Sequence, residues 1–98
     1  MGRGGKTMFK VITHKGFQIT FDNGWTVSVM FGGGNYCDNQ YDKYWMQNDE
    51  TVSVYECNTA EVAAWDKNNN WFDFGDDKVN GWCEPNYVAD FIQRVKNF

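Results

Sequence analysis

The sequence has no long hydrophobic run. No apolar stretch approaches the roughly 18 residues that a membrane span needs. The basic start, residues 1–7, is followed by no hydrophobic leader segment and no small-residue cleavage site. We therefore expect a protein that has no membrane partner and that is made and kept in a cytoplasm.

Histidine is almost absent, since His14 is the only one in the chain. General acid–base catalysis and catalytic triads most often use histidine as the base. His14 stands beside Gly16 in a predicted turn, where an exposed side chain is the ordinary outcome. Cys37, beside Asp38, is the one candidate nucleophile, and no local signature supplies it with a base. The sequence therefore predicts no catalytic residues and a protein that is not an enzyme.

Patterns typical of structural disulfides and metal sites are also missing. Cys37, Cys57 and Cys83 are odd in number and widely spaced, which fits neither a disulfide framework nor a zinc-binding C-x-x-C pair. We expect three thiols in a reducing compartment. The acids of the long loop, whose spacing does not match a calcium-binding loop, are Asp38, Asp42, Asp49 and Glu50. We predict no metal and no cofactor.

Positive charge is scarce in the middle of the chain. The formal net charge is −4, and residues 49–77 contain eight acids against Lys67 alone. Such a stretch repels a phosphate backbone, so we expect no nucleic-acid partner. The acids form either a solvated face that confers solubility or a surface that docks on a basic partner or in a groove meant for nucleic acid.

Aromatic residues are abundant. Five Trp, five Tyr and eight Phe in 98 residues provide large side chains for a core. This length suits one domain with a modest core. We predict a flexible N-terminal tail over residues 1–7 and a single domain over residues 8–98.

The first part of that domain alternates between apolar and polar residues. Residues 8–13, 17–21 and 25–31 have the composition or the period of two that is typical of half-buried strands. Asn23 and Gly24 tolerate the positive φ of a tight hairpin turn. Residues 8–31 are therefore predicted to form a three-stranded antiparallel meander.

The second part is expected to add strands and then a helix. Strands are predicted over residues 51–57, over residues 61–65 in a hairpin with residues 71–74, and over residues 79–82. Pro85 suits the first helical position, and apolar residues recur at helical spacing after it. The predicted fold class is α+β: an antiparallel β-meander of about five to six strands with one C-terminal amphipathic helix packed on the sheet.

A long loop after residue 31 is the predicted binding site. Consecutive glycines let a backbone approach a ligand and expose N–H groups, and amphipathic rings serve as stacking platforms or interface anchors. The other reading is a bulge followed by aromatic side chains that plug the end of a small core. The candidate residues are Gly32, Gly33, Gly34, Asn35, Tyr36, Tyr41, Tyr44 and Trp45.

Four stretches carry a resemblance to known sequences. They are residues 21–29 (FDNGWTVSV), 34–39 (GNYCDN), 59–66 (TAEVAAWD) and 81–85 (GWCEP) leading into 88–92 (VADFI). In these the chain resembles a family of small uncharacterised proteins of tailed phages and prophages. None of the stretches is a catalytic signature. The resemblance implies a phage origin and action in the cytoplasm of a host bacterium.

Three functions are compatible with these observations. The leading hypothesis is a phage accessory protein that antagonises a host process, immunity in particular, by stoichiometric binding of a host protein. The second is an oligomeric sponge that sequesters a small nucleotide-type signalling molecule at the glycine-rich loop. The third is a structural component of the virion or of its assembly.

Overall fold

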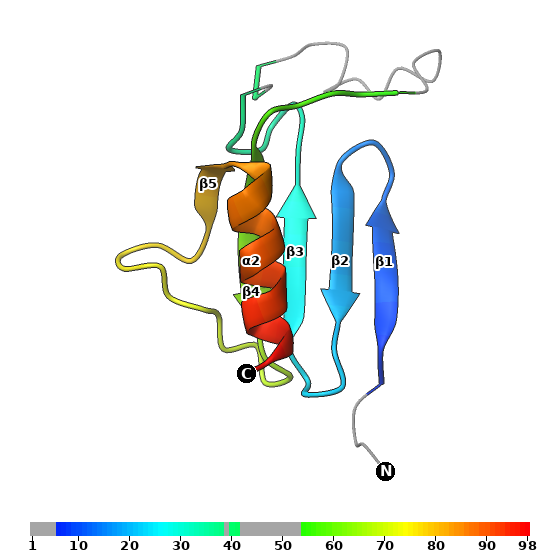
Figure 1. The fold of residues 1–98 in the computed structure, drawn as a ribbon, viewed down its shortest axis with the longest axis vertical. Coiled ribbons are helices and arrows are strands. Elements are labelled where there is room, and N and C mark those ends of the chain that lie inside the picture. The colour runs from blue at the N-terminus through cyan, green and yellow to red at the C-terminus, as the bar shows by residue number, and fades with distance from the viewer. Residues whose placement is uncertain (1–5, 39, 42–53) are drawn as a thin grey trace.

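The computed structural model describes residues 6–38, 40–41 and 54–98. Within them, five antiparallel strands form one sheet in the order β1-β2-β3-β4-β5, and a helix lies on one face of it (Figure 1). The elements are β1 (Met8–Ile12), β2 (Gly16–Thr20), β3 (Thr26–Met30), β4 (Ala60–Trp65), β5 (Asn80–Cys83) and α2 (Pro85–Lys96). The predicted α+β fold, with a meander and a C-terminal helix, is confirmed.

The two N-terminal hairpins follow from their turn residues. His14 takes a φ of 64°, and Gly16 takes a φ of 154° at a place where an added Cβ would collide with the carbonyl oxygen of Val29. Gly24 has a φ of 88°, and the Asn23 side chain accepts a 2.9 Å hydrogen bond from the backbone N–H of Trp25. This turn is thereby closed within four residues, as the Asn-Gly pair predicts.

The two ends of helix α2 carry residues that favour a helix start and a helix end. Pro85 occupies the first turn after the N-cap Glu84. Arg94 and Lys96 lie in the last turn, where cations are favourable. Asn23 Nδ2 donates a 2.9 Å hydrogen bond to the carbonyl oxygen of Val95, which fastens the β2–β3 turn to the end of the helix.

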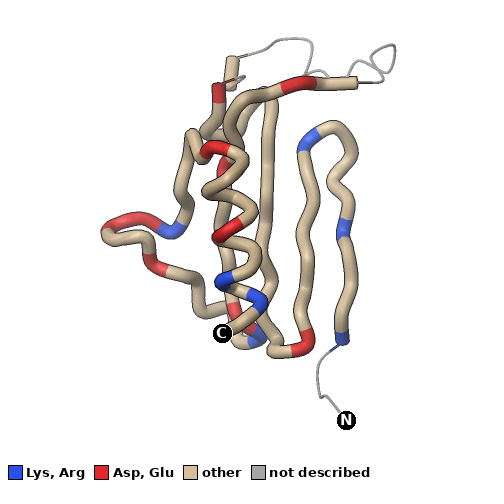
Figure 2. The backbone as a smooth tube through the Cα atoms, in the orientation of Figure 1, with Lys and Arg blue, Asp and Glu red and all other residues tan. Residues whose placement is uncertain are grey.

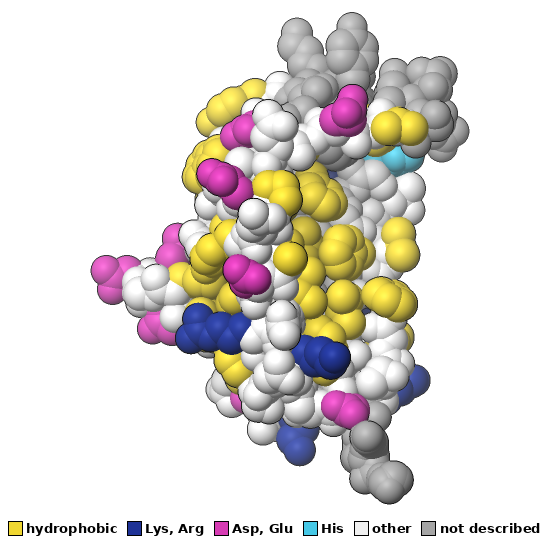
Figure 3. Space-filling view, in the orientation of Figure 1, with side chains coloured by type: hydrophobic (Ala, Val, Ile, Leu, Met, Phe, Trp, Pro, Cys, Tyr) yellow, Lys and Arg dark blue, Asp and Glu magenta, His cyan; other side chains and the backbone are white. Residues whose placement is uncertain are grey.

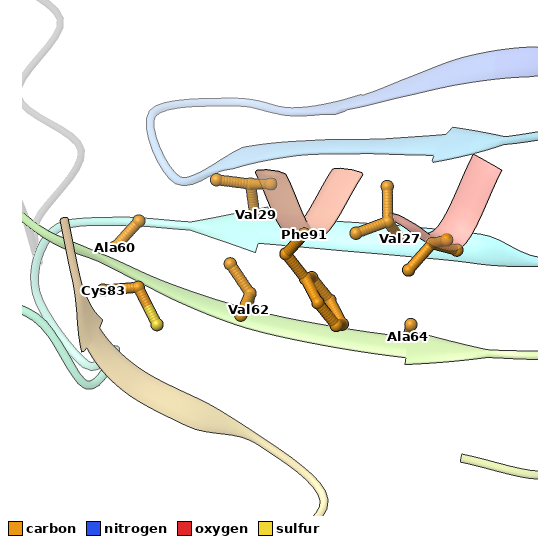
Figure 4. Close-up of a cluster of buried hydrophobic side chains, with 8 residues drawn as sticks. Val27, Val29, Ala60, Val62, Ala64, Cys83 and Phe91 are labelled. Carbon is orange, nitrogen blue, oxygen red and sulfur yellow. The ribbon is translucent and has the colours of Figure 1, made fainter. Parts of the chain in front are cut away.

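The core lies between α2 and the strands β3, β4 and β5 (Figure 4). Valine side chains from β3 and β4 pack under Phe91, which is 3% exposed. Phe72 and Phe74 add ring contacts to Phe91 at centroid distances of 5.4 and 5.2 Å. The apolar stripe of the helix therefore meets the sheet over its central strands and over the segment between β4 and β5.

Two predicted strands differ from the structure. Residues 54–57 belong to no strand, and residues 51–53 lie outside the described residues. Residues 71–74 form a single bridge, Trp65 to Trp71, in place of a strand. The Phe72 N–H still bonds to the carbonyl oxygen of Ala64, but the Phe74 N–H bonds to that of Asp77. The backbone donor of Phe74 is thus used in a local turn and not in pairing with β4, while both rings pack against the core beside Phe91.

The turn between β4 and residues 71–74 is as predicted. The Asp66 carboxylate accepts hydrogen bonds from the backbone N–H groups of Asn68 and Asn70, at 2.8 and 2.9 Å. The bond from the Asn70 backbone is the main reason that the pKa of Asp66 lies below its ordinary value of 3.8. The chain therefore reverses tightly between β4 and the Phe72–Phe74 segment.

No helix in the described part of the chain is both long enough and apolar enough to span a membrane.

Candidate partner-binding face

Two rows of apolar side chains run across the sheet on the face that carries α2. Residues paired directly across antiparallel strands point to the same face. The register therefore aligns Phe9, Ile19, Val27 and Ala64 in one row and Val11, Phe17, Val29 and Val62 in the other. The valines and the alanine on β3 and β4 are at most 1% exposed, whereas Phe9 is 74% and Val11 is 76% exposed.

The cause of this gradient is the width of the helix. An α-helix with its side chains is about 10–12 Å across, and neighbouring strands are about 4.8 Å apart, so one helix covers about two strands. α2 packs on β3 and β4. We call the apolar side chains that β1 and β2 present on this face the open half-sheet: Phe9 and Val11, which are exposed, and Phe17 and Ile19, which are partly buried against the core. Figure 3 shows the apolar side chains gathered beside the helix on this face.

An apolar pocket of about 250 Å³ continues this surface towards the helix. Phe17 belongs both to the open half-sheet and to the pocket wall, and Val88 and Ile92 of α2 form the opposite side. Val29, Phe31 and Ala60 also line it. The open half-sheet is therefore bounded by a recess of a size that can accept one large apolar side chain.

The outer edge of the sheet lies beside the same surface. The backbone N–H of Phe21 bonds to the carbonyl oxygen of Trp25, and that of Phe31 bonds to the carbonyl oxygen of Lys15. Odd-numbered residues of β2 thus bond towards β3, and even-numbered residues bond towards β1. Through the β1–β2 register, the N–H and C=O groups of Phe9 and Val11 point to the outer edge. The two most exposed side chains of the open half-sheet thus belong to the residues whose backbone is also exposed.

Charge is divided unevenly between this hairpin and the rest of the chain. All 13 acids follow residue 21, whereas four of the nine cations precede it. Within the described part of the hairpin these cations are Lys6, Lys10 and Lys15, coloured blue in Figure 2, and no acid accompanies them before Asp22. The β1–β2 hairpin is therefore a cationic segment of an anionic chain.

The predicted glycine-rich site is tied into the fold through its own backbone. The N–H of Gly32 bonds to Cys37 Sγ at 3.1 Å, and that of Gly34 bonds to the carbonyl oxygen of Gln40 at 2.9 Å. Lys15 Nζ donates to the carbonyl oxygen of Gly33 at 2.8 Å, and Asn35 Nδ2 donates to that of Phe31, also at 2.8 Å. These internal bonds use the N–H groups of Gly32 and Gly34, two of the donors that a phosphate group would require.

The predicted aromatic residues of this loop are placed separately. Tyr36 stacks on Trp82 at a centroid distance of 5.7 Å, and its backbone N–H donates to the Glu61 carboxylate at 3.0 Å. Tyr41 is 84% exposed. Tyr44 and Trp45 lie outside the described residues. The structure thus fixes Tyr36 against β5 and leaves Tyr41 at the surface, and the loop as a binding site stays a prediction.

Of the candidate metal-binding acids only Asp38 is described, and Asp42, Asp49 and Glu50 lie outside the described residues. Cys37 is 1% exposed, and burial raises the pKa of the Cys83 thiol, which disfavours the reactive thiolate. Cys37, Cys57 and Cys83, all of them among the described residues, form no disulfide bond with one another. The ring of His14 packs edge-on against that of Tyr55, with 5.6 Å between the ring centroids. No group of three or more His, Cys, Asp or Glu side chains able to hold a metal occurs among the residues described.

The open half-sheet is a site that the sequence analysis did not identify. The sequence pattern predicts half-buried strand positions for its apolar residues, and hence a covered face. One signal was available: a single predicted helix cannot cover a sheet of five strands.

Searches for similar proteins give no support for any family. No protein-family model, curated protein or solved structure matches the chain. The resemblance to tailed-phage proteins accordingly stays a prediction.

Proposed function

We propose that this chain is a non-catalytic binding protein that docks a partner protein on its open half-sheet in a fixed stoichiometry. The observation that carries this is the exposure of Phe9 and Val11, at 74% and 76%, at one end of apolar rows whose other ends are completely buried. Exposed apolar side chains that are contiguous with a core are typical of protein interaction sites, as is a strand edge that no other described strand pairs with.

The biological role that we propose is antagonism of a host process, immunity in particular, by a phage accessory protein. Its support is the sequence resemblance, together with the lack of a catalytic constellation among the described residues. The nucleotide sponge is less favoured, because the loop donors of Gly32 and Gly34 are engaged and the Glu61 carboxylate lies at the same loop. No described feature favours a virion component.

The test is native mass spectrometry of the tagged protein isolated gently from bacterial cells. We expect a partner in fixed ratio with the wild type, and its loss in the double variant Phe9→Thr/Val11→Thr. Threonine keeps strand propensity and removes most of the apolar surface. Thermal melting of the purified double variant must show a folded protein.

The matched control is Tyr41→Thr/Val54→Thr, which removes two other exposed apolar side chains, 84% and 71% exposed. This variant should retain the partner. Retention of the partner by the Phe9/Val11 variant, or the absence of any partner in fixed ratio, would refute the proposed site. Loss of the partner in the control alone would move the site to the loop that contains Tyr41.

A further inference from the structure

The edge of the open half-sheet offers a more specific recognition mode. A partner can lie across the face of a sheet, or it can add a strand to the edge through backbone hydrogen bonds. The outward N–H and C=O groups of Phe9 and Val11 satisfy the second geometry. Both faces of the strand that would be added can then be deduced from the two faces of β1.

One face of the added strand must be apolar. A residue that exchanges two backbone hydrogen bonds with Phe9 or Val11 lies directly opposite it, with its side chain on the same face of the sheet. That face is the one that carries α2 and the apolar recess, in which Phe17 takes part. Apolar side chains at these positions would continue the two rows across the sheet by one more strand.

The other face must be acidic. Lys10 is exposed on the face opposite to α2, and its partner on β2 is the uncharged Gln18. A residue opposite Lys10 on an added strand would occupy a pair without mutual backbone hydrogen bonds, in which the side chains approach most closely. A carboxylate there would lie beside the exposed Lys10, in a hairpin that contains no acid before Asp22.

Resting on the proposed function, we propose that the partner presents an extended segment in which apolar and acidic residues alternate, and that this segment pairs antiparallel with β1 as a sixth strand. The apolar residues bond to Phe9 and Val11 through the backbone. The acidic residues lie on the face of Lys10. A second copy of this chain is disfavoured at this edge, because isologous pairing of two β1 strands would place the two Lys10-bearing edges together.

The probe is a capped octapeptide of alternating valine and glutamate, titrated into ¹⁵N-labelled protein. We expect saturable shift changes centred on the amides of Phe9 and Val11, with an affinity that falls as salt is added. The matching peptide of valine and lysine should not bind. Lys10→Glu should weaken binding by about tenfold, and the control Lys78→Glu, in the segment between β4 and β5, should leave it unchanged.

Backbone pairing is tested on the peptide, which leaves the protein intact. N-methylation of the valines removes the donors that would face β1, and it should abolish binding. N-methylation of the glutamates places the methyl groups on the outer edge, and binding should persist. Equal binding of both methylated peptides, equal binding of the lysine peptide, or no binding of the acidic peptide would each refute the inference.

Different results would contradict the proposed docking function and the proposed strand addition. If the Phe9→Thr/Val11→Thr variant loses its partner while the acidic peptide does not bind, the face is a docking site and strand addition is wrong. If the peptide binds as expected but the double variant retains its cellular partner, β1 can accept an added strand and the proposed function is wrong. If sedimentation shows a dimer that persists when the peptide is added, the occupant of the edge is a second copy of this chain and the inference is overturned.

Discussion

Replacing a buried and an exposed phenylalanine by alanine tests the central claim that one half of the sheet is uncovered. Phe91 is 3% exposed and in contact with three other rings, whereas Phe9 is 74% exposed. Phe91→Ala should cost about 3–5 kcal/mol, because it removes a fully buried ring and leaves a cavity. Phe9→Ala loses only about 50 Å² of covered surface, which is worth about 1 kcal/mol.

The assay is equilibrium unfolding in urea, followed by the fluorescence of the five tryptophans. With a slope of about 1.5 kcal/mol per molar, Phe91→Ala should lower the midpoint by about 2–3 M, and Phe9→Ala by less than about 1 M. A domain of this size is stable by about 5–15 kcal/mol, so the cost of Phe91→Ala equals the whole stability at the lower end of that range. Phe91→Leu therefore serves as a milder companion.

Equal midpoint shifts for the two alanine variants would refute the reasoning, because Phe9 would then be buried in solution. Measurement at two protein concentrations identifies the cause. A Phe9→Ala penalty that grows with concentration indicates cover by a second copy, whereas a constant penalty indicates cover by the chain itself.

Three further predictions concern single residues. Gly16→Ala should destabilise the protein more than Gly34→Ala, because both glycines have positive φ but only the first would place its Cβ against a backbone carbonyl of β3; thermal melting checks this. The pKa of Asp66 is lowered in the folded state, so its contribution to stability is present above the ordinary value of 3.8 and is lost as the pH falls below it; Asp66→Asn should therefore reduce the loss of stability between pH 5 and pH 2 in a urea series. Maleimide at pH 7 should modify the half-buried Cys57 before the buried Cys83, whose pKa is raised by burial; peptide mass spectrometry gives the order, and faster labelling of Cys83 would contradict it.

Local signals were sufficient where a segment's conformation depends on its own residues. Asn23 and Gly24 predict the β2–β3 turn, and Pro85 predicts the start of the helix, because positive φ and a missing N–H are properties of single residues. Residues 54–57 mislead for the opposite reason. Alternating apolar residues favour a strand, but a strand forms only where a neighbouring strand accepts its hydrogen bonds.

The candidate site could not be predicted in the same way. The glycine and aromatic loop has the composition of a binding site, yet the structure joins its backbone donors to Cys37 and Gln40 and stacks Tyr36 on Trp82. The stacking contact connects residues that are 46 positions apart in sequence, and the two backbone bonds depend on the fold of the loop itself. Composition alone does not determine which donors remain exposed.

The sequence by itself determined the α+β class, the three-stranded meander and the amphipathic helix, because periodicity and turn chemistry act over a few residues. Only the tertiary structure decided where the helix rests. Alternation makes Phe9 and Val27 equivalent, as apolar positions on half-buried strands. The placement of α2 over β3 and β4 buries Val27 completely and leaves Phe9 74% exposed, because a single helix is too narrow to cover the remaining strands.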